Sequence, residues 1–415
     1  MKNIKLGTVP SNYKKTKKGN IIPFDWEVKD FYSCVSIVNG QVDPTNPPYI
    51  DMKHVGLENI EKHTGRLLFI KTAREEKLTS GKYFFNKGTV LYGKIRPELR
   101  KVYYAEFDGI CSADIYPLKP KENLYPKFLK YLITDERFYR FAVSASMRTG
   151  MPKINRDDIG GYYFLIPKKA EQEQIANILS TWDKAIELKE KLIDEKKKQK
   201  AGLMQKLLTG NVRFTGFNDA WEEVKFGKVF KFLNKERVSE PQNYKLLTVK
   251  LHLKGIEATE KYPNDTKNGR PYYLREPNEI LIGRQNYHNG GIGIVPSNMK
   301  NYIASNAISS LTTIKGDLMF LFYYISNVDF YKRVGHMIGG TGQKEISETT
   351  MKNLVLRIPK SLEEQKKIGE VLKTADNEID LLEKELESLK QQKKGLMQLL
   401  LTGIIRVNTQ ENEKR

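Results

Sequence analysis

Apolar residues recur at alternating spacings of four and three residues near the end of the chain. The pattern runs from Ile368 to Leu400, and nine of its ten positions are apolar. Its members are Ile368, Leu372, Ala375, Ile379, Leu382, Leu386, Leu389, Lys393, Leu396 and Leu400. A heptad pattern of this length predicts one long amphipathic helix whose apolar stripe packs against another helix.

The same positions 193 residues earlier carry a related pattern. They are Ile175, Leu179, Trp182, Ile186, Lys189, Ile193, Lys196, Lys200, Leu203 and Leu207. Lysines interrupt the middle of this pattern, where a long lysine stem can cover an apolar neighbour and leave its ammonium in water. We expect the two helices to pack on each other, antiparallel, as a coiled coil. The alternative, two ordinary helices that each pack on their own domain, is disfavoured by their length and near-identity.

The two helices are the best-conserved part of a long internal repeat. The sequence Gly-Leu-Met-Gln, followed by Leu-Leu-Thr-Gly, occurs at 202–210 and again at 395–403. When residues 171–210 are aligned with residues 364–403, about 21 of 40 positions are identical. A period this long predicts two copies of a large unit, and hence a pseudo-twofold molecule.

The repeat predicts five segments. Two poorly matched regions, residues 1–165 (head 1) and 211–357 (head 2), precede the two helices at 166–210 and 358–403, and residues 404–415 form a tail. Weak matches between the heads include Trp26-Glu27-Val28-Lys29 and Trp221-Glu222-Glu223-Val224-Lys225. A shared frame therefore carries two divergent heads.

Short runs of β-forming residues between glycines and prolines predict a mixed α+β fold for each head. The expected strands are Leu67–Ile70, Thr89–Tyr92, Ile110–Tyr116, Tyr162–Ile166, Lys245–Lys250, Glu279–Ile282, Leu311–Ile314 and Leu354–Ile358. One helix is expected late in each head, at Tyr125–Phe141 and at Leu318–Val334. Each head is thus predicted to be mostly β-sheet.

The composition indicates a cytoplasmic globular protein. No apolar run is long enough to span a membrane, and no signal-peptide core follows Met1. The two cysteines and five histidines show no spacing typical of a metal site. Two cysteines also indicate a reducing compartment rather than a disulfide framework.

The net charge of +20 is concentrated in the heads, which carry +10 (head 1) and +7 (head 2). The helices are nearly neutral in comparison. Two separate basic heads favour double-stranded DNA as the partner over an anionic membrane, because neither head contains an obvious basic amphipathic helix.

The segment Asn46-Pro47-Pro48-Tyr49 resembles the catalytic signature of DNA methyltransferases that methylate an exocyclic amine. Such an enzyme also needs a glycine-rich turn for its cofactor, and none precedes this segment. The equivalent segment of head 2, Glu240 to Tyr244, lacks the motif. We interpret Asn46–Tyr49 as a proline-rich lead into a strand, with a stand-alone adenine-N6 methyltransferase as the alternative.

Basic and polar loops are better candidates for a functional site, as DNA-binding segments. One loop follows the strand that ends at Gly93, and another follows the matching strand that ends at Gly283. Arginine can read guanine in the major groove, and asparagine or glutamine can read adenine. A second pair of polar segments flanks a Thr-Gly that both heads share. The predicted DNA-binding residues are Lys94, Arg96, Arg100, Lys101, Arg148, Lys153, Arg284, Gln285, Asn286, His288, Gln343 and Lys344.

The doubled pattern resembles the DNA specificity subunit of type I restriction-modification systems. The resemblance rests on the two tryptophan motifs, on Ile-Pro followed by Glu-Gln at the start of each helix, and on the two Leu-Leu-Thr-Gly ends. It implies two target-recognition domains that read a bipartite site and two docked adenine-N6 methyltransferase subunits. Motor-nuclease subunits are an optional addition.

The resemblance also implies that S-adenosylmethionine belongs to the methyltransferase partner and that this chain is not an enzyme. It identifies no universal base-contact residues. The residues expected to hold the helix pair and to dock partners are Ile175, Leu179, Trp182, Ile186, Ile368, Leu372, Ile379, Leu382, Leu386 and Leu389.

Overall fold

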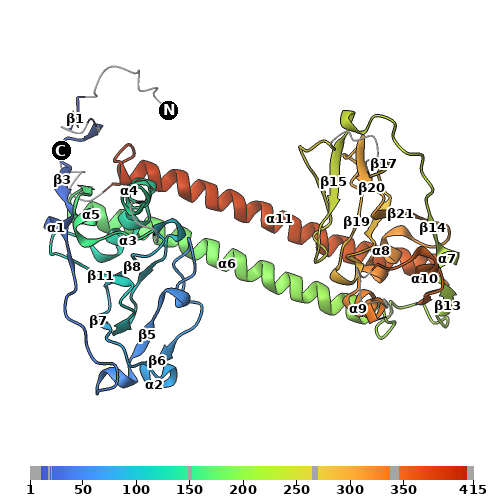
Figure 1. The fold of residues 1–415 in the computed structure, drawn as a ribbon, viewed down its shortest axis with the longest axis horizontal. Helices are drawn as coiled ribbons and strands as arrows, with labels where there is room; N and C mark the ends of the chain where they lie inside the picture. Colours follow the sequence, from blue (N-terminus) through green and yellow to red (C-terminus); the bar gives the residue numbers. More distant parts are fainter. Residues whose placement is uncertain are drawn as a thin grey trace. The chain divides into compact units, whose positions relative to one another are not determined.

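The structure is a computed structural model that describes residues 11–16, 19, 21–147, 152–263, 270–336 and 345–408. It contains two compact units (Figure 1). Unit 1 comprises residues 1–189 and 385–415, and unit 2 comprises residues 190–384. Each unit joins one head to a segment of both long helices, so the end of the chain belongs to the same unit as its beginning.

Head 1 is built on two four-stranded sheets, with strand orders β4-β11-β8-β9 and β6-β5-β10-β7. Only β5 and β10 pair in parallel within these sheets. The strands are β1 Tyr13–Lys15, β2 Ile21–Pro23, β3 Glu27–Asp30, β4 Val35–Ile37, β5 Lys53–Val55, β6 Lys71–Thr72, β7 Tyr83–Phe85, β8 Val90–Gly93, β9 Val102–Tyr104, β10 Gly109–Cys111, β11 Ile115–Pro120 and β12 Tyr163–Ile166. The helices are α1 Phe31–Cys34, α2 Ala73–Glu76, α3 Pro126–Thr134, α4 Glu136–Ser146 and α5 Arg156–Gly160, with 3-10 turns η1 Tyr49–Asp51, η2 Leu57–Asn59 and η3 Pro97–Leu99.

Head 2 repeats this architecture, with sheets β14-β21-β18-β19 and β16-β15-β20-β17. The parallel pair in these sheets, β15 with β20, corresponds to β5 with β10. The strands are β13 Glu222–Lys225, β14 Phe230–Phe232, β15 Lys245–Val249, β16 Ile256–Ala258, β17 Tyr272–Arg275, β18 Ile280–Gly283, β19 Ile292–Ile294, β20 Tyr302–Ser305, β21 Ile308–Thr313 and β22 Val355–Ile358. The helices are α7 Phe226–Val229, α8 Leu318–Ser326, α9 Val328–His336 and α10 Glu348–Lys352, with 3-10 turns η4 Pro241–Asn243 and η5 Tyr287–Asn289. The predicted repeat of an α+β head is confirmed.

The central strands β8 and β18 are apolar throughout because both of their faces are covered. Val90 and Tyr92 belong to the larger core of head 1, whereas Leu91 belongs to a second core on the other face. Ile280 and Leu281 divide between two cores of head 2 in the same way. Each central strand is therefore held rigidly, and the loop that follows it has a defined starting point.

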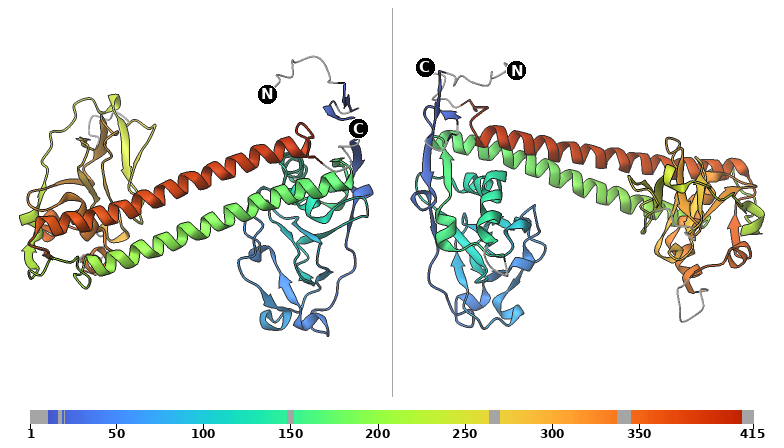
Figure 2. Two further views of the ribbon diagram at one scale, coloured as in Figure 1. Left: turned by 180° about the vertical axis from the view of Figure 1, so that it is seen from behind. Right: turned by 45° about the horizontal axis from the view of Figure 1, so that its top comes forward.

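The long helices α6 (Lys169–Leu207) and α11 (Leu362–Leu401) run antiparallel within each unit (Figure 2). In unit 1, Lys189 pairs with Glu385 at 2.7 Å, and Asp183 pairs with a lysine further along α11. In unit 2, Lys196 pairs with Glu378 at 2.6 Å. The antiparallel pairing is confirmed, and the lysines that interrupt the first heptad pattern carry ion pairs between the helices.

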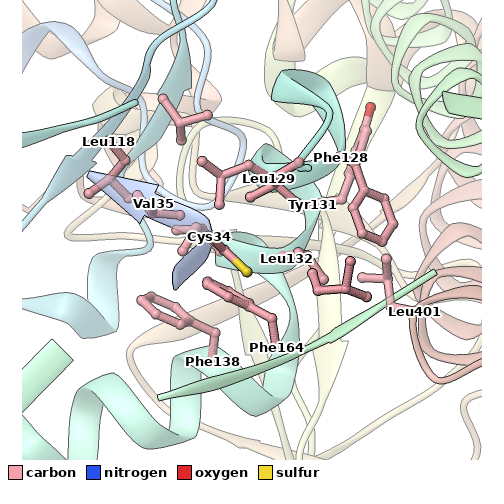
Figure 3. Packing of buried hydrophobic residues seen from close by; sticks show 14 of the residues in the cluster. Cys34, Val35, Leu118, Phe128, Leu129, Tyr131, Leu132, Phe138, Phe164 and Leu401 are labelled. Atoms are coloured by element: carbon pink, nitrogen blue, oxygen red, sulfur yellow. The ribbon is translucent and has the colours of Figure 1, made fainter. Parts of the chain in front are cut away.

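The repeated Leu-Leu-Thr-Gly sequence ends each helix inside a head. Leu400 and Leu401 lie in the large core of unit 1, and Figure 3 shows Leu401 beside the buried side chains of that core. Leu207 and Leu208 occupy the corresponding place in unit 2. The strong conservation of the helix ends between the two copies therefore has a packing cause.

The structure corrects three sequence-based predictions. Ile110–Tyr116 is not one strand, because a turn at Ser112 separates β10 and β11, which belong to different sheets. Tyr125–Phe141 is two helices, since Asp135 caps the start of α4. Leu318–Val334 is likewise broken at Asn327.

A fourth prediction is also wrong, because Leu67–Ile70 is not a strand. Only Leu67 forms an isolated bridge, to Ile60, and β6 begins at Lys71. Among the described residues, no helix is long and apolar enough to cross a membrane.

Candidate nucleic-acid interface

The predicted polar loops occupy equivalent places in the two heads. Basic loop 1 (residues 94–101) joins β8 to β9, and basic loop 2 (residues 284–291) joins β18 to β19. Each contains one 3-10 turn, η3 or η5, which begins three residues into the loop. The two loops are therefore structural counterparts, although their sequences differ.

Arg96 is the most accessible basic side chain of basic loop 1. It stands before η3 as its N-cap, with a left-handed backbone (φ 49°) that is uncommon for a residue other than glycine. Its backbone N–H donates to the carbonyl of Pro152 at 2.8 Å. The side chain is exposed and has no hydrogen bond or ion pair within the described part of the chain.

Lys153 lies beside basic loop 1, as part of an isolated bridge with Ile95. Burial of Lys94, followed by the repulsion from the Lys153 ammonium, lowers the pKa of the Lys94 side chain. The fold thus brings two predicted cationic segments together, and a repulsive pair of this kind would be relieved by a nearby anion.

The remaining cations of basic loop 1 hold the loop in place. The Lys94 ammonium donates to the carbonyl of Ala113 at 2.6 Å, and the Lys101 ammonium donates to the carbonyl of Leu57 at 2.5 Å. Arg100 pairs with Glu136 at 2.5 Å and stacks on a tyrosine ring of α4. These three side chains are already engaged by the protein, so Arg96 and Lys153 are the better candidates for contacts to a partner.

In basic loop 2, the exposed candidate is Asn286 rather than Arg284. The Arg284 guanidinium lies 2.9 Å from Glu345 and donates to the carbonyl of Asn306 at 2.8 Å. Asn286 is the N-cap of η5, and its side chain is exposed. Tyr287 anchors the loop, since its buried phenol donates to the carbonyl of Ile325 at 2.8 Å.

Gln285 and His288 are half-buried in this loop, and no partner for the His288 Nδ1 atom is found among the described residues. Arg148, Gln343 and Lys344 lie outside the described residues.

Arg96 and Asn286 are the exposed N-cap residues of equivalent turns. Their chemistry differs, since a guanidinium suits guanine and a carboxamide suits adenine.

The predicted helix-pair residues lie between the helices or under the heads. Ile175, Leu179, Ile368, Leu372 and Ile379 are buried. Trp182, Ile186, Leu382, Leu386 and Leu389 are partly buried. These side chains are therefore wholly or partly covered within the chain.

Two exposed leucines of the helices occupy equivalent positions, and neither was predicted. Leu188 is 53% exposed and Leu381 is 61% exposed, whereas the exposed Leu192 and Leu362 have no apolar counterpart in the other helix. Leu188 and Leu381 are 193 residues apart, which is the period of the repeat. The sequence alone could have identified these two leucines, because each helix carries one apolar residue at this position of the repeat, outside its heptad stripe.

The Asn46–Tyr49 segment forms a turn. The Asn46 amide donates to Asp43 at 3.2 Å, and Tyr49 begins η1. No cluster of three or more potential metal ligands occurs in the described ranges.

Comparisons with known proteins agree with this doubled architecture. The family model for the type I restriction modification DNA specificity domain matches residues 3–197 and again residues 218–391. The putative type I restriction enzyme MjaX specificity subunit of Methanocaldococcus jannaschii is 28% identical over 422 residues, which cover 96% of this chain and 97% of that protein. The type I restriction enzyme EcoDI specificity subunit of Escherichia coli is 35% identical over 154 residues, which cover 37% of this chain and 34% of that protein.

Solved structures show the same fold. The S subunit of a type I restriction-modification system from M. genitalium aligns with a TM-score of 0.58 at 18% identity, over 93% of this chain and 98% of that one. A chain from a structural study of the assembly of the type I restriction-modification system aligns with a TM-score of 0.56 at 16% identity, over 92% of this chain and 99% of that one.

Proposed function

Because the chain belongs to the family of type I restriction modification DNA specificity domains, we propose that its heads bind double-stranded DNA through basic loops 1 and 2. The chain is a type I specificity subunit with two target-recognition domains and is not itself catalytic. A stand-alone methyltransferase that uses Asn46–Tyr49 has no support from these relatives.

One observation carries the proposed mode of binding. Arg96 and Asn286 cap equivalent turns, are exposed, and have side chains with different base preferences. Both heads use the N-cap position of the same turn because both heads bind DNA. The residue at that position differs, Arg96 in one head and Asn286 in the other, because each head reads a different half-site.

The test is to reconstitute the full chain with its methyltransferase partner and to map the methylated sequences. We expect Arg96→Ala to relax one half of the bipartite target, and Asn286→Ala to relax the other half, each by about 1–3 kcal/mol at one position. Lys119→Ala, an exposed lysine on β11 of head 1, is the matched control. Unchanged recognition in both variants, with folding intact, would contradict the proposed loops.

We propose further that the helices dock the other subunits. The family places this chain in a system that assembles with methyltransferase and restriction subunits. Exposed Leu188 and Leu381 occupy equivalent positions of the repeat, so they support two equivalent methyltransferase docking points. S-adenosylmethionine would be bound by those partners, and motor-nuclease subunits would complete a system that cuts DNA. The complex would act in the cytoplasm, where its DNA substrate lies.

A further inference from the structure

A second loop in each head packs against the basic loop. Side loop 1 (residues 56–70) joins β5 to β6, and side loop 2 (residues 250–255) joins β15 to β16. The N–H of His63 donates to the carbonyl of Leu99 at 3.1 Å. The N–H of His252 donates to the carbonyl of Asn289 at 2.8 Å. Leu99 and Asn289 are each the last residue of the 3-10 turn in a basic loop.

The two histidines also share an unusual backbone. His63 has a φ of 65° and His252 a φ of 59°, so both are left-handed. This conformation costs a residue other than glycine some free energy and persists only where the surroundings impose it. The neighbouring backbone is closely packed in both loops, since a side chain on Gly65 would meet the carbonyl oxygen of Val102, and a side chain on Gly290 would lie 3.3 Å from the Cα atom of His252. The two side loops differ in length and sequence, yet they place a histidine in the same way.

The histidine rings are not needed for this packing. Both side chains are exposed, and neither makes a hydrogen bond or ion pair within the described part of the chain. The hydrogen bond from each histidine to the basic loop uses only the backbone N–H, which asparagine or glycine would supply equally well in a left-handed conformation. Each ring is therefore available to a partner outside the head.

The surroundings indicate a polyanion as the partner. Lys62 precedes His63, and Lys254 follows His252 by two residues. Both lysines are exposed and unpaired among the residues that the structure describes. Each histidine also stands at the end of the turn whose beginning is capped by Arg96 or Asn286. A three-residue 3-10 turn rises about 6 Å, which corresponds to roughly two base-pair steps.

We infer that His63 and His252 are additional DNA contacts, each within about two base pairs of the position contacted by Arg96 or Asn286. An imidazole there can donate to or accept from a base edge, or donate to a phosphate. The inference rests on the proposed function of basic loops 1 and 2. It gives each head a second DNA-contacting loop beside its basic loop. Aligning the sequences of the two heads does not reveal the equivalence of the histidines, because the side loops differ in length.

The experiment measures DNA binding and methylation by the reconstituted complex of the full chain with its methyltransferase partner. His63→Gly and His252→Gly remove the ring and retain the left-handed backbone. We expect each to weaken binding of the cognate duplex about tenfold, which is the effect of losing one DNA contact. A change confined to one or two positions of one half-site would identify a base contact. Uniform weakening, with a smaller salt dependence, would identify a phosphate contact.

Matched controls are Lys77→Gly in head 1 and Asn301→Gly in head 2. Both residues are exposed and left-handed, with φ values of 53° and 62°, but lie outside the side loops. His63→Asn and His252→Asn provide a second pair of variants if glycine lowers the unfolding temperature. Binding within twofold of wild type in folded histidine variants would overturn the inference. If Arg96→Ala and Asn286→Ala still alter recognition in that case, the proposed function survives and only the histidine contacts fail.

Discussion

The phenol of Tyr131 in α3 donates a hydrogen bond of 2.8 Å to the carboxylate of Asp183 in α6. In unit 2, Tyr323 of α8 donates to Asp376 of α11 at 2.6 Å. The two aspartates are 193 residues apart, so one bond between a head and its helix is built twice. Lysines of the opposite helix, Lys393 and Lys200, pair with the same two aspartates. Each aspartate thus joins three elements of its unit.

We predict that Asp183→Ala destabilises unit 1 by about 2 kcal/mol, because it leaves the Tyr131 phenol and two lysines without their shared partner. Asp183→Asn should cost less, since the amide oxygen still accepts from Tyr131. Urea unfolding at pH 7 measures both. Asp194→Asn, an exposed aspartate of α6, is the control, and an equal loss there would contradict this role.

The same aspartate predicts a dependence on pH. Burial alone would raise the pKa of Asp183, but Lys130 and Lys393 together lower it below its ordinary value of 3.8. A lowered carboxyl pKa stabilises the folded state above the unfolded value, and this stability is lost as pH falls through the folded pKa. We therefore expect the difference in stability between wild type and Asp183→Asn to shrink below about pH 4. A difference that stays constant from pH 7 to pH 2 would exclude the charge as its cause.

Arg406 carries a second repeated contact. Its guanidinium binds Glu171 at 2.6 and 2.7 Å and Asp25 at 2.9 Å, and Glu171 is a buried side chain. In unit 2, Arg213 binds the equivalent Glu364 through two bonds of 2.8 Å. Arg213 and Arg406 are again 193 residues apart, so residues just beyond the helix ends serve the same purpose in both units.

We predict that Arg406→Ala destabilises unit 1 by about 3–5 kcal/mol, because it leaves the buried Glu171 carboxylate without its cation. Adding Glu171→Gln should restore part of this loss, since a neutral amide is less costly to bury and can still accept from the Trp26 indole. A double-mutant cycle by urea unfolding measures the coupling. Strictly additive effects would mean that the two side chains do not interact.

Head 2 contains a buried polar network around Arg275, at a position where head 1 has the apolar residue Phe85. Arg275 ends β17 and is 2% exposed, whereas its counterpart Phe85 ends β7 and is 1% exposed. Ser310 accepts from Arg275 at 2.7 Å and donates to Glu279 at 2.8 Å, and Lys235 pairs with that glutamate. Burial lowers the pKa of Arg275 to about 10.

We expect Arg275→Ala to destabilise head 2 by about 3 kcal/mol or more, because it removes a filled volume and leaves the carbonyl of Ile308 and the Ser310 hydroxyl without their donor. Phe85→Ala should cost head 1 a similar amount through the lost burial of the ring and the cavity left behind, with no hydrogen bond involved. Thermal unfolding compares the two. Arg275→Met tests the mechanism, since a neutral stem of similar length should recover the volume but not the hydrogen bonds.

The proposed docking of methyltransferase subunits on Leu188 and Leu381 predicts how many of these subunits each variant retains. Leu188→Asp and Leu381→Asp place a charge on the exposed leucines of α6 and α11. Each single variant should retain one methyltransferase subunit, and the double variant should retain none, if each leucine belongs to a docking point of its own as proposed. Native mass spectrometry counts the subunits. Gln199→Asp, an exposed position of α6, adds the same charge as a control. Loss of both partners in one single variant would contradict separate docking points.

The sequence by itself determined the long helices, the repeat and many of the strands. Heptad spacing and alternation report burial within one element, so α6, α11, β8, β12, β15 and β22 follow from local pattern. The residues at the helix ends could be recognised for the same reason, since the two copies keep the same sequence. The sequence also indicates a loop after β8 and after β18, because glycine marks the end of each strand; that these loops bind DNA stays a prediction.

Only the tertiary structure decided which side chains of those loops are free. Arg284 and Asn286 are both polar residues of the same loop. Glu345 and Asn306, which are distant along the chain, contact Arg284 but leave the Asn286 side chain exposed. The run Ile110–Tyr116 divides between two sheets for a similar reason, because sheet order depends on pairing with remote strands. His63 and His252 become equivalent only through hydrogen bonds from one loop to another. Such contacts depend on the path of the whole chain, and the local periodicity of a sequence carries no record of them.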